Sequence, residues 1–182
     1  MSIYVRVLLR FLMLFFIQIM VLSKIPLLFE WKTNLPSYTP YIYMLFIALL
    51  PVSVKTSHMI VFSFITGLTM DIFSDTGGIH AIACLFMGVS RTPILRFILP
   101  KPLQEYKSSS PSLKEMKTIP FITYILALFF VHLLIYYFIE IWSFKAIGYL
   151  AIKLLFSLLT ACIFALIYTM IFSKSIEKRY FD

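Results

Sequence analysis

The stretch DIFSDTGGIHA, residues 71–81, holds the side chains of this sequence that could most readily do chemistry. It places two carboxylates, Asp71 and Asp75, two glycines and His80 between segments that are almost wholly apolar. Carboxylate oxygens and an imidazole nitrogen could bind a metal ion, but three loosely spaced groups without a fourth are a weak signal. The DTG tripeptide that begins at Asp75 also matches aspartic proteases, whose chemistry needs two carboxylates that share a proton. Asp71 is the only acidic residue well within an apolar run, so the pattern does not indicate an enzyme.

A capped turn between two helices explains the same stretch more simply. Asp75 or Ser74 can accept hydrogen bonds from the first backbone N–H groups of a following helix. Gly77 and Gly78 can adopt positive φ without a clash of a Cβ atom. We therefore interpret this stretch as a turn that joins two helices.

The composition predicts that these helices lie in a membrane. The 182-residue chain is 61% apolar and 13% charged, with a mean hydropathy of +0.94. A soluble domain is about 45–50% apolar and about 25% charged. Sixteen Lys and Arg against eight Asp and Glu give a net charge of +8. The cations are scattered at the ends of apolar runs, which indicates membrane orientation rather than nucleic-acid binding. Cys84 and Cys162 lie within apolar runs without a metal-binding spacing, so no cofactor is predicted.

Hydropathy predicts an all-α membrane protein with six transmembrane helices in a single domain, residues 1–182. A helix needs about 20 residues to cross the hydrocarbon core. The predicted spans cover residues 7–29, 39–54, 57–73, 79–99, 120–142 and 147–172. The second span is the shortest, because Pro40 and Pro51 bracket its apolar centre. Residues 100–118 are rich in Lys, Ser and Pro and are predicted to form a flexible cytoplasmic loop.

The distribution of cations predicts the orientation of these spans. With a cytoplasmic N-terminus, six crossings leave four cations on the outer half, namely Lys24, Lys32, Lys145 and Lys153, and the other twelve on the cytoplasmic side. This bias follows the positive-inside rule. We therefore predict that both termini of this multi-pass protein are cytoplasmic.

Small residues and charges share one face on each of the third and fourth spans. The faces consist of Ser63, Gly67 and Asp71 on the third span and of Ala81, Cys84, Gly88 and Arg91 on the fourth. Small residues let helix backbones approach closely, and van der Waals packing holds helices together in lipid. We expect these two spans to form a tight hairpin.

Three other polar or helix-breaking positions need an explanation in the bilayer. Lys153 could form a buried ion pair with Asp71 or could extend to the membrane interface, and the sequence leaves both open. Pro93 is expected to kink or end the fourth helix near the cytoplasmic face. His132, alone midway along the fifth span, is interpreted as a hydrogen-bonded packing residue rather than a proton relay.

The order of these motifs resembles the MreD family of rod-shape-determining bacterial membrane proteins, in the version with an extended loop after the fourth helix. The resemblance rests on PYIYMLFIALLP, FITGLTMDIFSDTGGIHA and SRTPILRF, and it covers about residues 36–106. The matching positions include Gly67, Asp71, Gly78, His80, Arg91 and Pro93. One departure is Thr92, which separates an Arg and a Pro that are commonly adjacent in the family.

The resemblance implies a noncatalytic scaffold subunit of the cell-elongation complex in the bacterial cytoplasmic (inner) membrane. Such proteins bind MreC and act with MreB, the glycosyltransferase RodA and a penicillin-binding transpeptidase to organise lateral peptidoglycan synthesis. The family is also similar in fold to the six-helix substrate-binding components of energy-coupling-factor transporters, which implies a compact bundle. The residues expected to bind partners or pack helices are Ser63, Gly67, Asp71, Gly77, Gly78, His80, Gly88, Arg91 and Pro93.

The alternative function is a vitamin-binding subunit of an energy-coupling-factor transporter. Those subunits contact the coupling subunit through alanines spaced four apart on the first helix, and the first span here contains no Ala. An intramembrane hydrolase ranks third, because the sequence lacks paired catalytic residues.

Overall fold

The computed structural model describes residues 3–24, 39–106, 110–142 and 147–177. Five long helices dominate it: α1 (Ile3–Met20), α4 (Thr56–Ser74), α5 (Ile79–Ile98), α7 (Thr118–Ile141) and α8 (Ile147–Glu177). Shorter elements are η1 (Leu22–Lys24), α3 (Met44–Ala48), η2 (Leu103–Tyr106) and α6 (Leu113–Met116). The described ranges contain no strand, so the predicted all-α class is confirmed.

Five helical stretches are long and apolar enough to cross a membrane. They are Val7–Lys24, Thr56–Ser74, Ile79–Ile98, Thr118–Ile141 and Ile147–Ile171. Their outward faces expose large apolar side chains such as Phe16, Ile72, Phe86 and Ile163, as expected for helices surrounded by lipid. The chain is therefore a multi-pass membrane protein. The predicted end of the first span, residues 25–29, lies outside the described residues.

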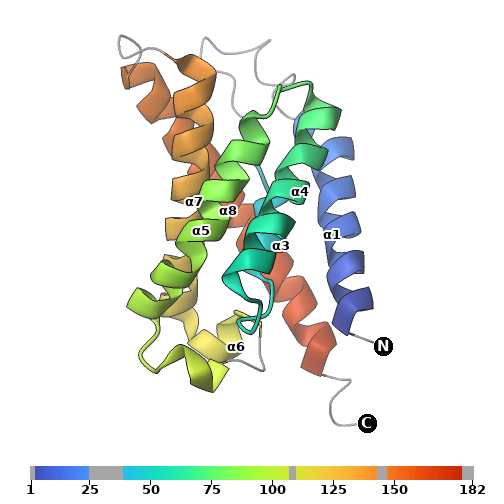
Figure 1. Cartoon of the computed structure of the whole chain (residues 1–182), viewed down its shortest axis with the longest axis vertical. Helices are drawn as coiled ribbons and strands as arrows, with labels where there is room; N and C mark the ends of the chain where they lie inside the picture. The colour runs from blue at the N-terminus through green and yellow to red at the C-terminus, as the bar shows by residue number, and fades with distance from the viewer. Residues whose placement is uncertain (1–2, 25–38, 107–109, 143–146, 178–182) are drawn as a thin grey trace.

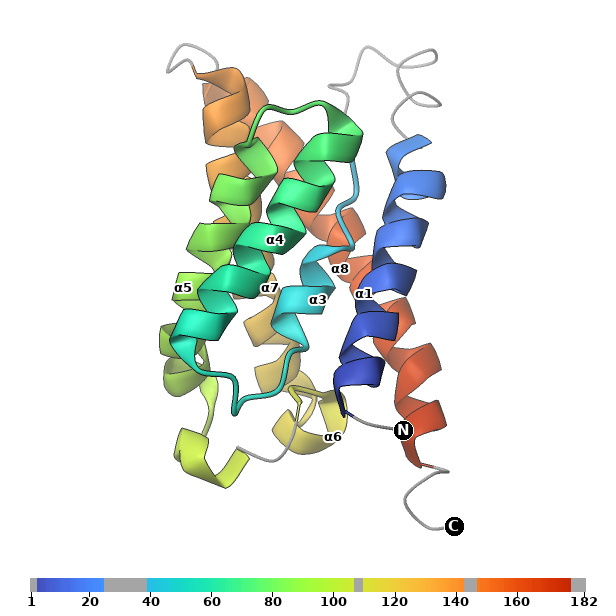
Figure 2. The same ribbon diagram turned by 45° about the vertical axis from the view of Figure 1, so that its right-hand side comes forward.

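The predicted helical span over residues 39–54 is corrected by the structure, because only Met44–Ala48 is α-helical there. Pro51 lacks a backbone N–H and disfavours a helical conformation at the preceding residue, which favours an end of the helix near this position. Residues 40–51 are nevertheless all buried, and Figure 2 shows them running between α1 and α4 toward the end where α4 begins. Irregular backbone at membrane depth is tolerated only where protein surrounds it, because lipid offers no hydrogen-bond partners.

The long helices surround residues 40–51, which we call the broken segment. Along the chain α4 packs on α5, α5 on α7 and α7 on α8, while α3 contacts α1, α4, α5 and α7. Figure 1 shows that α1 begins and α8 ends at one end of the bundle, which we call the terminal end. The α4–α5 turn lies at the opposite end, the turn end (Figure 1).

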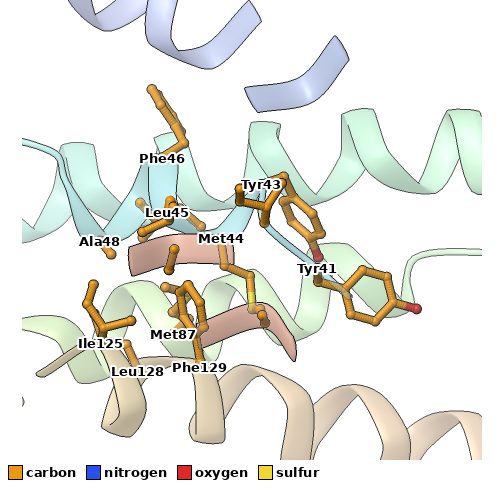
Figure 3. Close-up of a cluster of buried hydrophobic side chains, with 14 of the residues drawn as sticks. Tyr41, Tyr43, Met44, Leu45, Phe46, Ala48, Met87, Ile125, Leu128 and Phe129 are labelled. Atoms are coloured by element: carbon orange, nitrogen blue, oxygen red, sulfur yellow. The ribbon is translucent and has the colours of Figure 1, made fainter. Parts of the chain in front are cut away.

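Apolar side chains fill the space between α3 and its neighbours. Met44, Leu45 and Ala48 are fully buried, and Figure 3 shows them beside Met87 of α5 and Phe129 of α7. Lipid is as apolar as these side chains, so their contacts stabilise the fold mainly through van der Waals packing. Close packing here fixes the position of the broken segment.

The predicted flexible loop over residues 100–118 contains ordered structure in its described parts, 100–106 and 110–118. Leu103, Tyr106 and Leu113 pack against the core, and Met116 is buried. These apolar side chains are spaced too irregularly among Lys, Ser and Pro to produce a hydropathy signal. On the exposed side, the hydrogen bond between Lys101 and the Glu105 carboxylate, 3.0 Å apart, raises the pKa of Lys101. The described parts of this segment lie at the terminal end of the bundle (Figure 1).

Pro93 does not end the fourth predicted helix. α5 continues past it to Ile98, so of the two expected outcomes, a kink or an end of the helix, the end is wrong. Transmembrane helices tolerate an internal proline when neighbouring groups take over the freed backbone hydrogen bonds.

Candidate functional site

The α4–α5 pair is the tight small-residue hairpin that the sequence predicted. A Cβ atom on Gly67 would lie 2.5 Å from the Ala81 Cα and from the carbonyl oxygen of His80, which are both backbone atoms. A Cβ atom on Gly88 would clash with the side chain of Ser63. The two helices thus touch at two levels where only glycine leaves enough room.

Asp71 on α4 caps the N-terminus of α5. Its Oδ1 accepts hydrogen bonds from the Thr76 hydroxyl (2.6 Å) and the His80 backbone N–H (3.0 Å), and its Oδ2 accepts one from the Ala81 backbone N–H (2.8 Å). The N-cap residue itself, Gly78, has no side chain that could do this. A carboxylate at a helix N-terminus satisfies free N–H groups and interacts favourably with the helix dipole.

The turn differs from its prediction in one respect. Gly77 and Gly78 adopt positive φ values of 60° and 100°, as expected. The predicted capping of α5 by Asp75 or Ser74 is wrong, because Asp71 occupies that role from the preceding helix. Asp75 instead ends α4 in the left-handed conformation, with its backbone N–H bonded to the Asp71 carbonyl.

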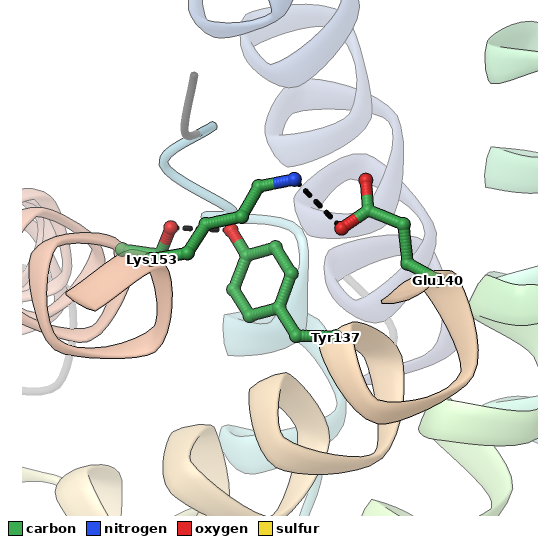
Figure 4. A network of polar contacts seen from close by, with 4 residues as sticks. Tyr137, Glu140 and Lys153 are labelled. Atoms are coloured by element: carbon green, nitrogen blue, oxygen red, sulfur yellow. Dashed lines mark hydrogen bonds and ion pairs between the residues drawn. The ribbon is translucent and has the colours of Figure 1, made fainter. Parts of the chain in front are cut away.

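The proposed ion pair of Asp71 with Lys153 is also corrected. Lys153 on α8 contacts the Glu140 carboxylate of α7 at 2.7 Å, and its Nζ lies 5.0 Å from the centre of the Tyr137 ring. Figure 4 shows this cluster, in which the Tyr137 hydroxyl also bonds to Ser157. Glu140 was not predicted as the partner of Lys153, because a carboxylate near the end of an apolar run resembles an interfacial residue.

Three consecutive carbonyl groups at the C-terminus of α3 each accept a hydrogen bond from a different long helix. The pairs are Tyr124 Oη with Ala48 O (2.8 Å), Arg10 Nη1 with Leu49 O (2.8 Å) and Arg91 Nη2 with Leu50 O. Arg91 Nε also donates to the Tyr124 hydroxyl at 3.1 Å. The last carbonyls of a helix have no partner within it, and cations at that end interact favourably with its dipole. Arg91 thus holds the broken segment in place.

Gln18 on α1 holds the other end of the segment. Its amide Nε2 donates to Pro40 O at 3.2 Å, and its Oε1 accepts from the Ile42 backbone N–H at 2.7 Å. The side-chain amide therefore pairs with backbone groups as a neighbouring strand would. This contact was not predicted, although a lone glutamine within the apolar run of the first span could have indicated a buried hydrogen bond.

A third set of buried polar contacts lies between the two ends of the broken segment, around Tyr43. The Tyr43 hydroxyl is 2.7 Å from His80 Nδ1 and 2.7 Å from His132 Nε2, with Cys84 Sγ at 4.0 Å. The ring of Tyr136 lies beside both imidazoles, with its centroid 4.6 Å from that of His80. His132 is hydrogen-bonded as predicted, but its Nδ1 has no partner among the described residues.

Most of the residues predicted to bind partners or pack helices contribute to packing within the chain itself. Buried within the bundle are Ser63, Gly67, Asp71, His80, Gly88 and Arg91. Gly77 and Pro93 are exposed, and Gly78 is half-buried in the turn. Among the described residues, no group of three or more His, Cys, Asp or Glu side chains could hold a metal ion.

Several side chains of the long helices hydrogen-bond to the irregular backbone of the broken segment, and we call each such contact a clamp. They come from Arg10, Gln18, Arg91 and Tyr124. Each clamp comes from a long helix and satisfies a main-chain group that lipid could not satisfy. Comparison with known proteins gave no match to a family model, to a curated protein or to a solved structure.

Proposed function

We propose that this protein is a noncatalytic scaffold subunit of the cell-elongation complex in the bacterial cytoplasmic membrane. In this role it binds MreC and, with MreB, RodA and a penicillin-binding transpeptidase, helps to organise lateral peptidoglycan synthesis. The resemblance of residues 36–106 to the MreD family supports the proposal. So does the structural use of the residues that carry it, because Asp71 caps the α4–α5 turn and Arg91 holds the broken segment.

The observation that carries the scaffold assignment is that buried polar side chains bind the chain's own backbone. Gln18, Asp71 and Arg91 all donate to or accept from main-chain groups within the bundle. Such fixed internal contacts give a rigid bundle, and a rigid bundle keeps its outward helix faces in constant positions. Those faces are apolar, as required for packing against other transmembrane helices.

Within this proposal, MreC docks on the outward face of the α4–α5 hairpin, because the inner face of the hairpin packs against the rest of the bundle. Ile65 and Ile72 of α4 are 50% and 71% exposed there. Replacing either with Trp adds bulk toward the lipid without touching the interior. Leu159 on the outward face of α8 is 51% exposed and provides a matched control.

Co-purification with MreC from detergent-solubilised membranes tests this surface. We expect Ile65→Trp and Ile72→Trp to reduce recovery of MreC, and Leu159→Trp to leave it unchanged. Equal recovery in all three variants would remove the hairpin from the proposed interface.

Depletion of the protein in its native host tests the function itself. We expect cells to lose their elongated shape and to regain it when the wild-type chain is restored. Vitamin auxotrophy without a shape defect, or a vitamin identified by mass spectrometry in the purified protein, would favour the transporter alternative.

A further inference from the structure

The Tyr43 hydroxyl lies between two imidazoles that are sealed inside the bundle. Tyr43, His80 and His132 are each no more than 1% exposed. A hydroxyl has a single proton, so it can donate to only one of the two nitrogens at 2.7 Å. The other imidazole must therefore carry a proton and donate to the Tyr43 oxygen.

The unpartnered Nδ1 of His132 favours one direction for this chain of hydrogen bonds. If Tyr43 donated to His132 Nε2, the proton of His132 would sit on Nδ1 as a buried donor without an acceptor. Buried donors without partners are rarer in proteins than under-satisfied acceptors. The favoured chain therefore runs from His132 Nε2–H to Tyr43, and from the Tyr43 hydroxyl to His80 Nδ1.

Among the described residues, one charged side chain is hydrogen-bonded to these three residues. Tyr41 from the broken segment, Cys84 from α5 and Tyr136 from α7 face the cluster as neutral groups. From α4, the Asp71 carboxylate accepts the backbone N–H of His80. Burial in an apolar interior opposes an added charge on the imidazoles, and the Asp71 carboxylate offsets part of this cost at His80.

Side chains of α7 lead from the cluster to the turn end. His132, Tyr136 and Glu140 stand four residues apart and therefore share one face of the helix. The rings of His132 and Tyr136 are stacked with centroids 6.3 Å apart, and the Glu140 side chain is 34% exposed. The accessible Glu140 carboxylate thus lies on the same face of α7 as the buried imidazole of His132.

We propose that Tyr43, His80 and His132 form a buried proton-binding site, and that proton uptake loosens the hold of α5 and α7 on residues 40–51. A proton taken from water onto His80 Nδ1 turns that atom from an acceptor into a donor. The Tyr43 oxygen would then accept from both imidazoles, and its own proton would lack an acceptor in an apolar interior. The hydrogen-bonded arrangement of Tyr43, His80 and His132 in the structure is thus stable when both imidazoles are neutral, and acidification weakens it.

Nitrogen-15 NMR of histidine-labelled protein in nanodiscs tests the site directly. The chain has three histidines, and the third, His58, is exposed and serves as an internal reference. At about pH 8 we expect His132 as the Nε2–H tautomer, and on acidification to about pH 4 we expect His80 to bind a proton at Nδ1 with a coupled change in the signals of His132. Tyr43→Phe should uncouple them. Failure of both buried imidazoles to bind a proton in this range, or independent titration of the two, would overturn the proposal.

Thermal unfolding provides a second measurement. We expect the unfolding temperature of the wild type to fall by several degrees between about pH 8 and about pH 5, the range in which imidazoles commonly titrate. His58→Gln should keep this dependence, whereas Tyr43→Phe and His80→Gln should lose most of it. An unchanged dependence in the latter two would contradict the proposal, and if they do not fold, the wild-type NMR titration decides. Both experiments use the purified chain alone, so their outcome is independent of MreC binding.

Discussion

The Asp71 carboxylate on α4 accepts a hydrogen bond from the backbone N–H of Ala81 on α5 at 2.8 Å. The same carboxylate accepts the N–H of His80 and the hydroxyl of Thr76, so one side chain organises the turn and the start of the next helix. An acidic residue within a membrane helix is expensive unless its charge is satisfied. Here the satisfying groups are backbone donors, which themselves would be costly to leave unpaired in lipid.

Replacing Asp71 with Ala is therefore expected to lower the free energy of unfolding by about 1–3 kcal/mol, the usual cost of leaving buried donors unsatisfied. Chemical or thermal denaturation in detergent measures the change. Asp75→Asn is the matched control, because Asp75 is exposed and Asn tolerates its left-handed conformation. A loss in the control equal to that in Asp71→Ala would argue against the cap.

Gly67→Ala is expected to push α4 and α5 apart. The added Cβ would meet Ala81 Cα and His80 O at 2.5 Å, and neither backbone atom can move without moving the helix. Overpacking of this kind costs about 1–3 kcal/mol. Gly148→Ala on α8 provides the control, since among the described residues no atom outside its own stretch of helix lies within 4 Å of the added Cβ. We expect that variant to be as stable as the wild type or slightly more so, because Ala favours a helix.

Arg91→Leu and Tyr124→Phe are expected to release the C-terminus of α3. Each removes a donor from a buried carbonyl group, Leu50 O or Ala48 O, and should lower the free energy of unfolding by about 1–3 kcal/mol. Arg96→Leu removes an exposed cation from the same helix as Arg91 and should change stability by less than about 0.5 kcal/mol. Limited proteolysis should show earlier cleavage within residues 40–51 in the first two variants. If Arg96→Leu were cleaved as early as Arg91→Leu, loss of the hydrogen bond from Arg91 to Leu50 O would not explain the cleavage.

Lys117→Gly is expected to stabilise the protein. Lys117 has φ 65° and ψ 168°, a backbone conformation that is essentially restricted to glycine and costs other residues about 1–3 kcal/mol. The unfolding temperature should therefore rise. Lys117→Ala removes the same charge but keeps a Cβ, so it should not reproduce the gain. A rise of equal size in both variants would assign the effect to charge instead of backbone strain.

Cysteine labelling tests the predicted orientation. Asp75 lies in the turn at one end of the bundle, and Lys55 precedes α4 at the other, and both are exposed. In right-side-out membrane vesicles, a membrane-impermeant maleimide should label Asp75→Cys directly and Lys55→Cys only after permeabilisation. The reverse pattern would place the termini outside. The wild-type chain controls for Cys84 and Cys162.

Much of the bundle could be predicted from the sequence, because a membrane imposes strong compositional rules. Long apolar runs must be helical in lipid, so the all-α class and five crossing helices follow from hydropathy alone. The contact of Gly67 with α5 was equally predictable, since small residues four apart on adjacent spans favour close packing. The positive φ values of Gly77 and Gly78 followed from the turn that joins them.

The remaining features depend on contacts between residues far apart in the chain. Hydropathy could not separate a sixth helix from a short helix with irregular ends, because residues 40–51 are equally apolar in either case. The choice depends on whether other helices offer donors and acceptors to the free backbone groups. Arg10, Gln18 and Arg91 do so, from positions 22–41 residues away along the chain.

The partner of each buried charge was decided in the same way. Asp71 and Lys153 are both ionisable residues in apolar runs, and no spacing in the sequence distinguishes a mutual pair from two separate ones. In the folded bundle Lys153 meets Glu140 at 2.7 Å, and Asp71 meets the start of α5. Sequence alone therefore determined which segments enter the membrane, since transfer into lipid depends on local composition. Only the tertiary structure decided which buried polar groups meet, since hydrogen bonds require atoms within about 3 Å and that distance is set by packing.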